Sequence, residues 1–175
     1  MNRQMKHILI ALLLALCLLG LSGAESQAEA FGPQRRILAA DFAVYSEAGE
    51  SLHLSDLRGT PVVVNVFASW CPPCRSELPA FARMMDEYGE QVRFLMVDLS
   101  TAGGDTPDKV AALLQALELD FPVWYDDDGA VAYAYRVSAL PVTLFVTAEG
   151  ELSYTQVGMI LEEDLEERLE ALVQD

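Results

Sequence analysis

The feature that most constrains this 175-residue chain is an apolar run that leads directly into two closely spaced cysteines. Val62 to Phe67 is almost continuously apolar and rich in β-branched side chains, which is typical of a central parallel strand covered on both faces. Cys71 and Cys74 follow, and the segment from Pro72 to about Tyr88 has the apolar spacing of a helix. Two cysteines at this separation can bond to each other in the first turn of a helix. The sequence therefore predicts a redox-active pair at the edge of a sheet, with the Cys71 sulfur exposed.

A Cys-x-x-Cys pair can also be half of a zinc site, so the remaining ligands decide between the two interpretations. The third cysteine is Cys17, near the N-terminus, and the histidines are His7 and His53. Because a structural zinc site takes four such ligands, none can be assembled from cysteine and histidine outside the N-terminal leader. A merely stapling disulfide is also disfavoured, since so short a loop gains little stability from chain entropy. We expect redox chemistry, no metal and no cofactor.

The N-terminus has the pattern of an export signal. Arg3 and Lys6 precede an apolar run from Ile8 to Leu21, and small residues follow. The run is short for a membrane span, which needs about 20 residues, so a cleaved signal is favoured over a retained anchor. We expect residues 1–30 to be a signal peptide or, as the alternative, an N-terminal membrane anchor. Residues 31–175 are expected to form one domain whose two cysteines suit an oxidising compartment.

The charge of the chain excludes some partners. Acidic residues outnumber basic ones 27 to 11, which gives a net charge of −16. Such a surface repels nucleic acid and anionic membranes, so we expect no nucleic-acid partner. Contact with a membrane is expected only if the N-terminal segment is retained.

The remaining apolar patterns predict strands that alternate with helices, and hence an α/β fold with a central mixed sheet flanked by helices. Gly49 marks the turn of a short N-terminal β-hairpin. The other predicted strands are 92–99, 121–125, 142–147 and 152–157, and the other predicted helices are 106–119, 127–135 and 161–173. The acidic run 126–128 lacks the ligand spacing of a calcium loop and is expected to start a helix.

The residues of the motif suggest how the pair would work. Cys71 is the candidate nucleophile because a helix N-terminus favours thiolate over thiol, and the deeper Cys74 would resolve the mixed disulfide. Pro72 and Pro73 suit the first helical turn but remove two amide donors, which leaves the Cys74 amide as the nearest donor to a thiolate. A less stabilised thiolate makes a more reducing pair. Trp70 is expected to shield the sulfurs and to offer contact surface to a substrate.

Two polar residues near the motif have structural explanations. Asn65, within the buried strand, is expected to make a satisfied hydrogen bond. Glu77, one turn beyond Cys74, is expected to be a solvated helix residue, although it could also tune the cysteine pair.

Residues 63–79, with the sequence V-V-N-V-F-A-S-W-C-P-P-C-R-S-E-L-P, resemble the core of the TlpA/ResA-type thioredoxin-like family. The resemblance extends over about residues 37–174. It implies a thioredoxin-like fold with the N-terminal β-hairpin and a strand–helix insertion at about residues 105–135. Members of this family are exported or membrane-tethered thiol–disulfide oxidoreductases.

The same resemblance gives a meaning to Leu140 and Pro141, which precede the apolar strand 142–147. Taken alone, Pro141 would be an ordinary proline at a strand edge. In a thioredoxin-like fold a proline at this place is held in cis beside the cysteine pair. The backbone of Leu140 would then be free to pair with an extended substrate, facing the Cys71 sulfur.

The resemblance also implies a function, which is reduction of protein disulfides in the periplasm or at the outer face of the cytoplasmic membrane. Such proteins often act on apocytochrome c during cytochrome c biogenesis and take electrons from a membrane protein of the CcdA/DsbD type. Three alternatives stay open: a DsbA-like oxidant, a peroxiredoxin-type peroxidase, and a non-catalytic chaperone or metal-delivery module. The peroxidase is disfavoured because Thr-x-x-Cys is replaced by Ala68-Ser69-Trp70-Cys71.

Overall fold

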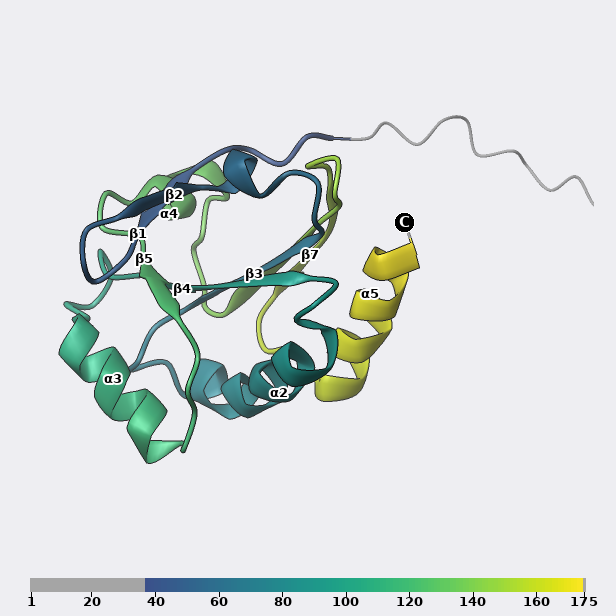
Figure 1. The fold of residues 1–175 in the computed structure, drawn as a ribbon. Coiled ribbons are helices and arrows are strands. Elements are labelled where there is room, and N and C mark those ends of the chain that lie inside the picture. The colour runs from purple at the N-terminus through teal and green to yellow at the C-terminus, as the bar shows by residue number, and fades with distance from the viewer. Residues whose placement is uncertain (1–36, 175) are drawn as a thin grey trace, which may run out of the picture. The chain divides into compact units, whose positions relative to one another are not determined.

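The structure is a computed structural model that describes residues 37–174, so the predicted signal segment lies outside the described residues. The elements in chain order are β1 (Ala43–Tyr45), β2 (Ser51–His53), the 3-10 helix η1 (Leu54–Leu57), β3 (Val62–Phe67), α2 (Pro72–Tyr88), β4 (Arg93–Asp98), α3 (Pro107–Ala116), β5 (Val123–Tyr125), α4 (Ala130–Ala134), β6 (Val142–Val146), β7 (Leu152–Val157) and α5 (Glu162–Gln174). The strands form one seven-stranded sheet in the order β2-β1-β5-β4-β3-β6-β7 (Figure 1). Among the helices of residues 37–174, none is long and apolar enough to cross a membrane.

Strand β3 lies inside the sheet, as its apolar run predicts. It pairs in parallel with β4 and antiparallel with β6, and all six of its residues are buried. Its side chains alternate between two cores. Val63 and Phe67 point to one core, and Val64 points to the other. This two-sided burial explains why the sequence of β3 shows no polar alternation.

Helices cover both faces of the sheet. Figure 1 shows α2, α3 and α5 on one face and α4 on the other. The first core joins β3 to the buried side chains of these three helices, among them Phe81, Leu113 and Leu169. The second core packs Val131 of α4 against β3, β4 and β6. The predicted α/β fold with a mixed sheet flanked by helices is confirmed.

The predicted strand–helix insertion is present as α3 and β5, followed by α4. Strand β5 pairs in parallel with β4 and antiparallel with β1, so it connects the N-terminal hairpin to the middle of the sheet. Helix α4 is shorter than the predicted 127–135. Asp126 accepts hydrogen bonds from the amides of Val131 and Ala132, and Asp128 accepts one from Ala130. The acidic run therefore starts the helix from outside it, as capping carboxylates do.

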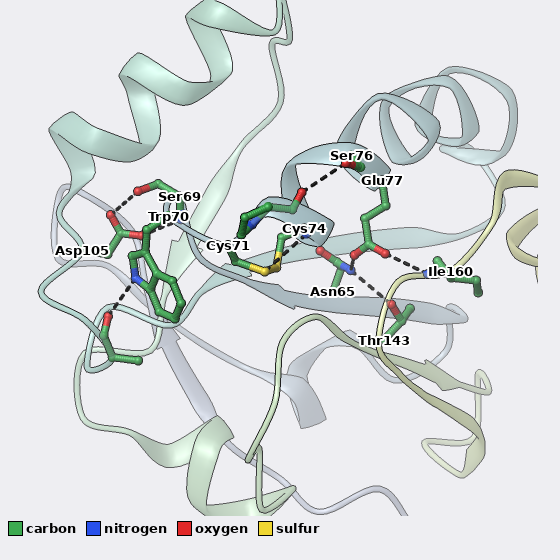
Figure 2. Close-up of a disulfide and its surroundings, with 12 residues drawn as sticks. Asn65, Ser69, Trp70, Cys71, Cys74, Ser76, Glu77, Asp105, Thr143 and Ile160 are labelled. Atoms are coloured by element: carbon green, nitrogen blue, oxygen red, sulfur yellow. Dashed lines mark hydrogen bonds between the residues drawn. A yellow bond between two sulfur atoms is a disulfide. The ribbon is translucent and has the colours of Figure 1, made fainter.

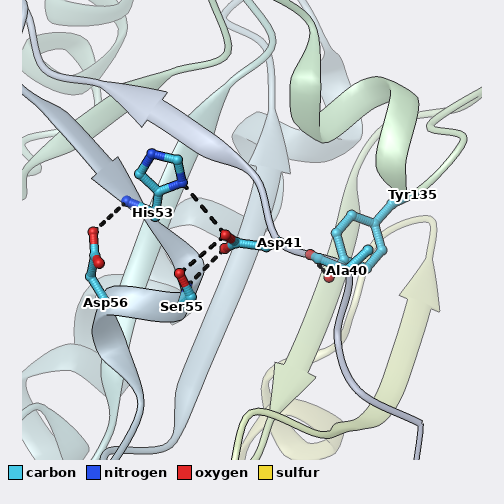
Figure 3. Close-up of polar contacts among 6 residues, drawn as sticks. All are labelled: Ala40, Asp41, His53, Ser55, Asp56 and Tyr135. Carbon is cyan, nitrogen blue, oxygen red and sulfur yellow. Dashed lines mark hydrogen bonds and ion pairs between the residues drawn. The ribbon is translucent and has the colours of Figure 1, made fainter.

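Side-chain contacts fix the segment before β1 (Figure 3). The Asp41 carboxylate accepts hydrogen bonds from the Ser55 amide at 2.9 Å and from the Ser55 hydroxyl at 3.1 Å. His53 Nδ1 lies 3.5 Å from the same carboxylate. On the other side, the Tyr135 hydroxyl donates to the Ala40 carbonyl at 2.8 Å. These contacts hold the segment before β1 against η1 and the end of α4.

Candidate active site

The two cysteines lie where β3 passes into α2 (Figure 2). Cys71 is the N-cap of α2, and Pro72 and Pro73 occupy the first helical positions. Cys71 and Cys74 form a disulfide, with their Cα atoms 5.3 Å apart. The pairing is the one that the spacing of the motif predicts.

The sulfur of Cys71 is less open to solvent than expected. Cys71 is 3% exposed and Cys74 is 0% exposed, and both contribute to the core beneath α2. The prediction of an exposed Cys71 sulfur is therefore wrong. Only a small part of Cys71 reaches the surface, because the residue packs within the first core. The prediction that Cys74 is the more deeply buried of the two is confirmed.

The exposed part of Cys71 opens into a surface hollow of about 450 Å³. The residues that line this hollow are Trp70, Cys71, Pro72, Pro73, Leu99, Ala102, Val137, Ser138, Ala139 and Leu140. Five of the residues predicted for the site therefore meet here, while Cys74 and Pro141 are buried behind it. Trp70 is 51% exposed and presents a large apolar surface beside the sulfur. The site suits an apolar or extended segment of another chain.

The peptide bond between Leu140 and Pro141 is cis, as predicted. The Pro141 carbonyl accepts a hydrogen bond from the Gly158 amide at 2.8 Å, which ties this turn to the end of β7. Leu140 lines the same hollow as Cys71. The structure thus brings together two elements that are far apart in the sequence.

The Cys71 sulfur accepts a hydrogen bond from a backbone amide. The Cys74 backbone N–H donates to Cys71 Sγ at 3.3 Å. Pro72 and Pro73, which lie between the cysteines, have no N–H to add. This is the donor arrangement that the two prolines predict.

Glu77 is buried, so the expectation that it would be solvated is wrong. It is 2% exposed, and its carboxylate accepts hydrogen bonds from Asn65 Nδ2 at 2.8 Å and from the Ile160 amide at 2.9 Å. Burial raises the pKa of Glu77 to about 7, although both hydrogen bonds oppose the rise. The reason for the burial is helical spacing, because Cys74, Leu78 and Glu77 share the face of α2 that packs on the sheet.

Asn65 makes the structural hydrogen bonds that were expected of it. Its Nδ2 donates to Glu77 and, at 3.1 Å, to Thr143 Oγ1. Its Oδ1 has no hydrogen-bond partner within the described part of the chain. Asn65 therefore connects β3, α2 and β6 directly behind the disulfide (Figure 2).

A second set of contacts, which the sequence analysis missed, positions the residues before Cys71. The Asp105 carboxylate accepts hydrogen bonds of 2.6 Å from both the amide and the hydroxyl of Ser69. The Trp70 indole N–H donates to the Ala102 carbonyl at 3.3 Å. These contacts join residues 36 and 32 positions apart, so no local pattern indicates them.

Comparison with known proteins identifies the family. The model of the AhpC/TSA family matches residues 37–155. The chain belongs to this family. It is 30% identical over 139 residues to the thioredoxin-like protein YneN of Bacillus subtilis (strain 168), an alignment that covers 79% of this chain and 81% of that protein. It is 32% identical over 135 residues to the thiol-disulfide oxidoreductase ResA of Geobacillus kaustophilus (strain HTA426), which covers 77% of this chain and 75% of that protein.

Solved structures give the same relationship. A putative thiol:disulfide interchange protein DsbE from Chlorobium tepidum is similar with a TM-score of 0.68 and 26% identity, covering 80% of this chain and 98% of that one. StoA from Bacillus subtilis is similar with a TM-score of 0.63 and 26% identity, covering 75% and 97%. The resemblance to ResA-type proteins and the thioredoxin-like fold are thereby confirmed. The protein is a thiol–disulfide oxidoreductase, an enzyme whose substrates are disulfide-bearing proteins.

Proposed function

We propose that the protein reduces protein disulfides, with Cys71 as the attacking thiol and Cys74 as the resolving thiol. The observation that carries this proposal is that Cys71 lines the hollow while Cys74 lies behind it. The Cys71 thiolate attacks one sulfur of the substrate disulfide, which forms a mixed disulfide and releases the other sulfur as a thiolate. The Cys74 thiolate then attacks Cys71 Sγ, which restores the Cys71–Cys74 disulfide and releases the second substrate thiolate. Two electrons pass from the enzyme to the substrate.

Replacement of each cysteine tests this division of roles. Cys71→Ser should abolish the reduction of insulin disulfides, because no thiol remains at the hollow. Cys74→Ser should accumulate mixed disulfides that non-reducing electrophoresis and mass spectrometry detect, because the resolving thiol is missing. Full activity of the Cys71→Ser protein would contradict the mechanism.

The direction of the reaction is proposed from the two prolines of the motif. Because Pro72 and Pro73 offer no amides, the Cys71 thiolate is little stabilised, which favours a reductant. We expect a reduction potential nearer to about −270 mV, as in thioredoxin, than to about −120 mV, as in DsbA. Equilibration with glutathione or dithiothreitol buffers measures it. A value above roughly −150 mV would instead support the DsbA-like oxidant.

The proposed location is the periplasm or the outer face of the cytoplasmic membrane. The charged and apolar pattern of residues 1–30 supports export, with residues 31–175 as the mature domain. The exposed lipoprotein thioredoxin Etrx1 of Streptococcus pneumoniae strain TIGR4 has a similar structure, with 28% identity and a TM-score of 0.63. A membrane donor of the CcdA/DsbD type would re-reduce the pair, and apocytochrome c is a proposed substrate. The mass of the exported protein distinguishes a cleaved signal from a retained anchor.

A further inference from the structure

Asp98, the last residue of β4, is a buried carboxyl group that the disulfide chemistry does not use. It is 0% exposed, and within residues 37–174 no N–H or O–H group donates a hydrogen bond to either of its carboxyl oxygens. Its register partners in the sheet are Phe67 on β3 and Tyr125 on β5. An ionised carboxylate is strongly destabilised at a buried position that offers it no donor. The neutral, protonated form of Asp98 is the one that this environment accepts.

A proton on Asp98 has an acceptor close by, which is the carboxyl group of Asp105. Asp105 acts on Asp98 through its charge and as a hydrogen-bonding neighbour, and both effects favour a proton on Asp98. Asp105 is 6% exposed and already accepts hydrogen bonds from the Ser69 amide, the Ser69 hydroxyl and, at 3.2 Å, the Thr106 amide. Two adjacent carboxylates repel each other, whereas one proton between them makes a hydrogen bond.

We infer that Asp98 and Asp105 share one proton, and that Asp98 is a positioning residue that holds the Asp105 carboxylate against Ser69 and so fixes the approach to Cys71. Figure 2 shows the Asp105 carboxylate pointing to Ser69, next to the Trp70 indole. The pairing of the two carboxyl groups does not depend on what the protein does. Its effect on substrate binding rests on the proposed function.

The position of the pair explains how it acts on the hollow. Asp98 and Asp105 flank the loop 99–104, so the shared proton closes the base of this loop. Ala102, in the loop, accepts the hydrogen bond from the Trp70 indole and lines the hollow. Loss of the proton places two negative charges at the base of the loop, which loosens the contacts that hold Trp70.

The groups around Asp98 favour a shared proton over a bound cation. The charged groups that act on its pKa are Asp105 and, from the turn after β5, Asp127, and both are acids. Tyr125 faces it from β5, and the Lys109 ammonium of α3 donates to the Gly104 carbonyl at 2.6 Å. On the side of α2 the cysteines are bonded to each other. Within the described residues, no group of acids, histidines or cysteines could hold a metal ion.

The surroundings also give the pH range in which the proton is lost. Burial, followed by the charge of Asp105, raises the pKa of Asp98 from 3.8 to about 8. The proton is therefore held at neutral pH and is lost as the pH rises through about 8. The fluorescence of Trp70 should change when the proton is lost, because the Trp70 indole is hydrogen-bonded to Ala102 in the loop.

Fluorescence of the oxidised protein tests the pair, since disulfide-bonded cysteines do not titrate. The chain has two tryptophans, so Trp124→Phe leaves Trp70 as the only tryptophan, whose emission is separated from that of the tyrosines by selective excitation. We expect its emission to change between pH 6 and 9.5 with a midpoint near about 8. Asp98→Asn should remove this transition, because an amide donates to Asp105 at every pH. Asp108→Asn, which changes an exposed acid of α3, is the matched control and should keep the transition.

Absence of the transition in the parent protein, or its persistence in Asp98→Asn, would overturn the inference. If Asp98→Asn does not fold, carbon-13 NMR of the aspartate carboxyl groups in the parent protein determines whether Asp98 is protonated. The assigned Asp98 resonance should be that of a protonated carboxyl group at pH 6.5. An ionised Asp98 at this pH would overturn the inference.

Kinetics test the positioning role separately. The parent protein and Asp98→Asn are compared at the same pH, so that the titration of the cysteine thiols, which both proteins contain, cancels in the ratio of their rates. Between pH 7 and pH 9 the ratio of the parent's kcat/KM for insulin disulfides to that of Asp98→Asn should fall by about threefold to tenfold, the effect of one hydrogen bond. With a small aromatic disulfide the same ratio should not change between the two pH values. An equal change for both substrates, or no change, would overturn the positioning role. Failure of all variants to reduce insulin would count against the proposed function. The pH transition of the Trp70 fluorescence would still test the carboxyl pair.

Discussion

Glu77 is a single residue whose protonation is linked to the folding of the protein. Its pKa rises from 4.5 in the free side chain to about 7 in the fold, because burial disfavours the charged form. Folding therefore takes up a proton between about pH 4.5 and 7. The resulting stabilisation is complete below pH 4.5 and is lost as the pH rises through about 7.

Glu77→Gln should remove this pH dependence, because an amide does not titrate. Between pH 5 and 8 the free energy of unfolding of the parent protein should fall relative to that of the variant, by at most about 1.4 kcal/mol per pH unit for one proton. Urea unfolding of the oxidised proteins measures the difference. Glu87→Gln, an exposed change on the same helix, should follow the parent. A Glu77→Gln protein with the pH profile of the parent would show that Glu77 is ionised in the fold.

At the scale of elements, the loop 99–104 supports Trp70. Gly103 and Gly104 both have a positive φ, of 68° and 67°. A Cβ atom on Gly103 would lie 2.6 Å from the Trp70 indole nitrogen, whereas a Cβ on Gly104 would meet nothing within 4 Å. The two glycines therefore share a backbone requirement and differ in their contact with the side chain beside Cys71.

Gly103→Ala and Gly104→Ala form a matched pair of variants that separates these effects. Both should lose about 1 kcal/mol of stability, because alanine is disfavoured in the left-handed region. Only Gly103→Ala should also shift the Trp70 emission and raise the KM for insulin disulfides, since its methyl group displaces the indole. Urea unfolding and steady-state kinetics check this. Equal KM values for the two variants would contradict the role of the loop as the support of Trp70.

The elements with strong local signals could be predicted from the sequence, and the others only in part. The bounds of β3 and α2 agree with the prediction, because a β-branched run defines the strand and Pro72 and Gly89 delimit the helix. Helix α4 begins three residues later than predicted, at Ala130. The side chains of Asp126 and Asp128 accept the first amides of this helix, which no apolar periodicity indicates.

For the molecule as a whole, the local part of the site could be predicted and the long-range part could not. Trp70 to Cys74 are neighbours in the chain, and the resemblance to ResA-type proteins added Leu140 and Pro141. The burial of Glu77 depends on Ile160, which is 83 residues away, and the position of Ser69 depends on Asp105. Such contacts follow from how the helices and loops lie on the sheet, and a polar residue within an apolar stripe does not reveal them.

Backbone hydrogen bonds of the first described residues place Ile37 at the end of the sheet away from the disulfide. Leu152 donates its amide hydrogen to the Ile37 carbonyl, and Ala39 donates to Gly150, so the chain enters at the turn between β6 and β7. That turn lies at the end of the sheet where Val62 of β3 pairs with Val146. The disulfide lies past the other end of β3, a strand length of roughly 20 Å away. An affinity tag fused directly to Ile37 would therefore begin at the end of the sheet opposite the disulfide, so immobilisation of residues 37–174 through such a tag should leave the hollow beside Cys71 accessible.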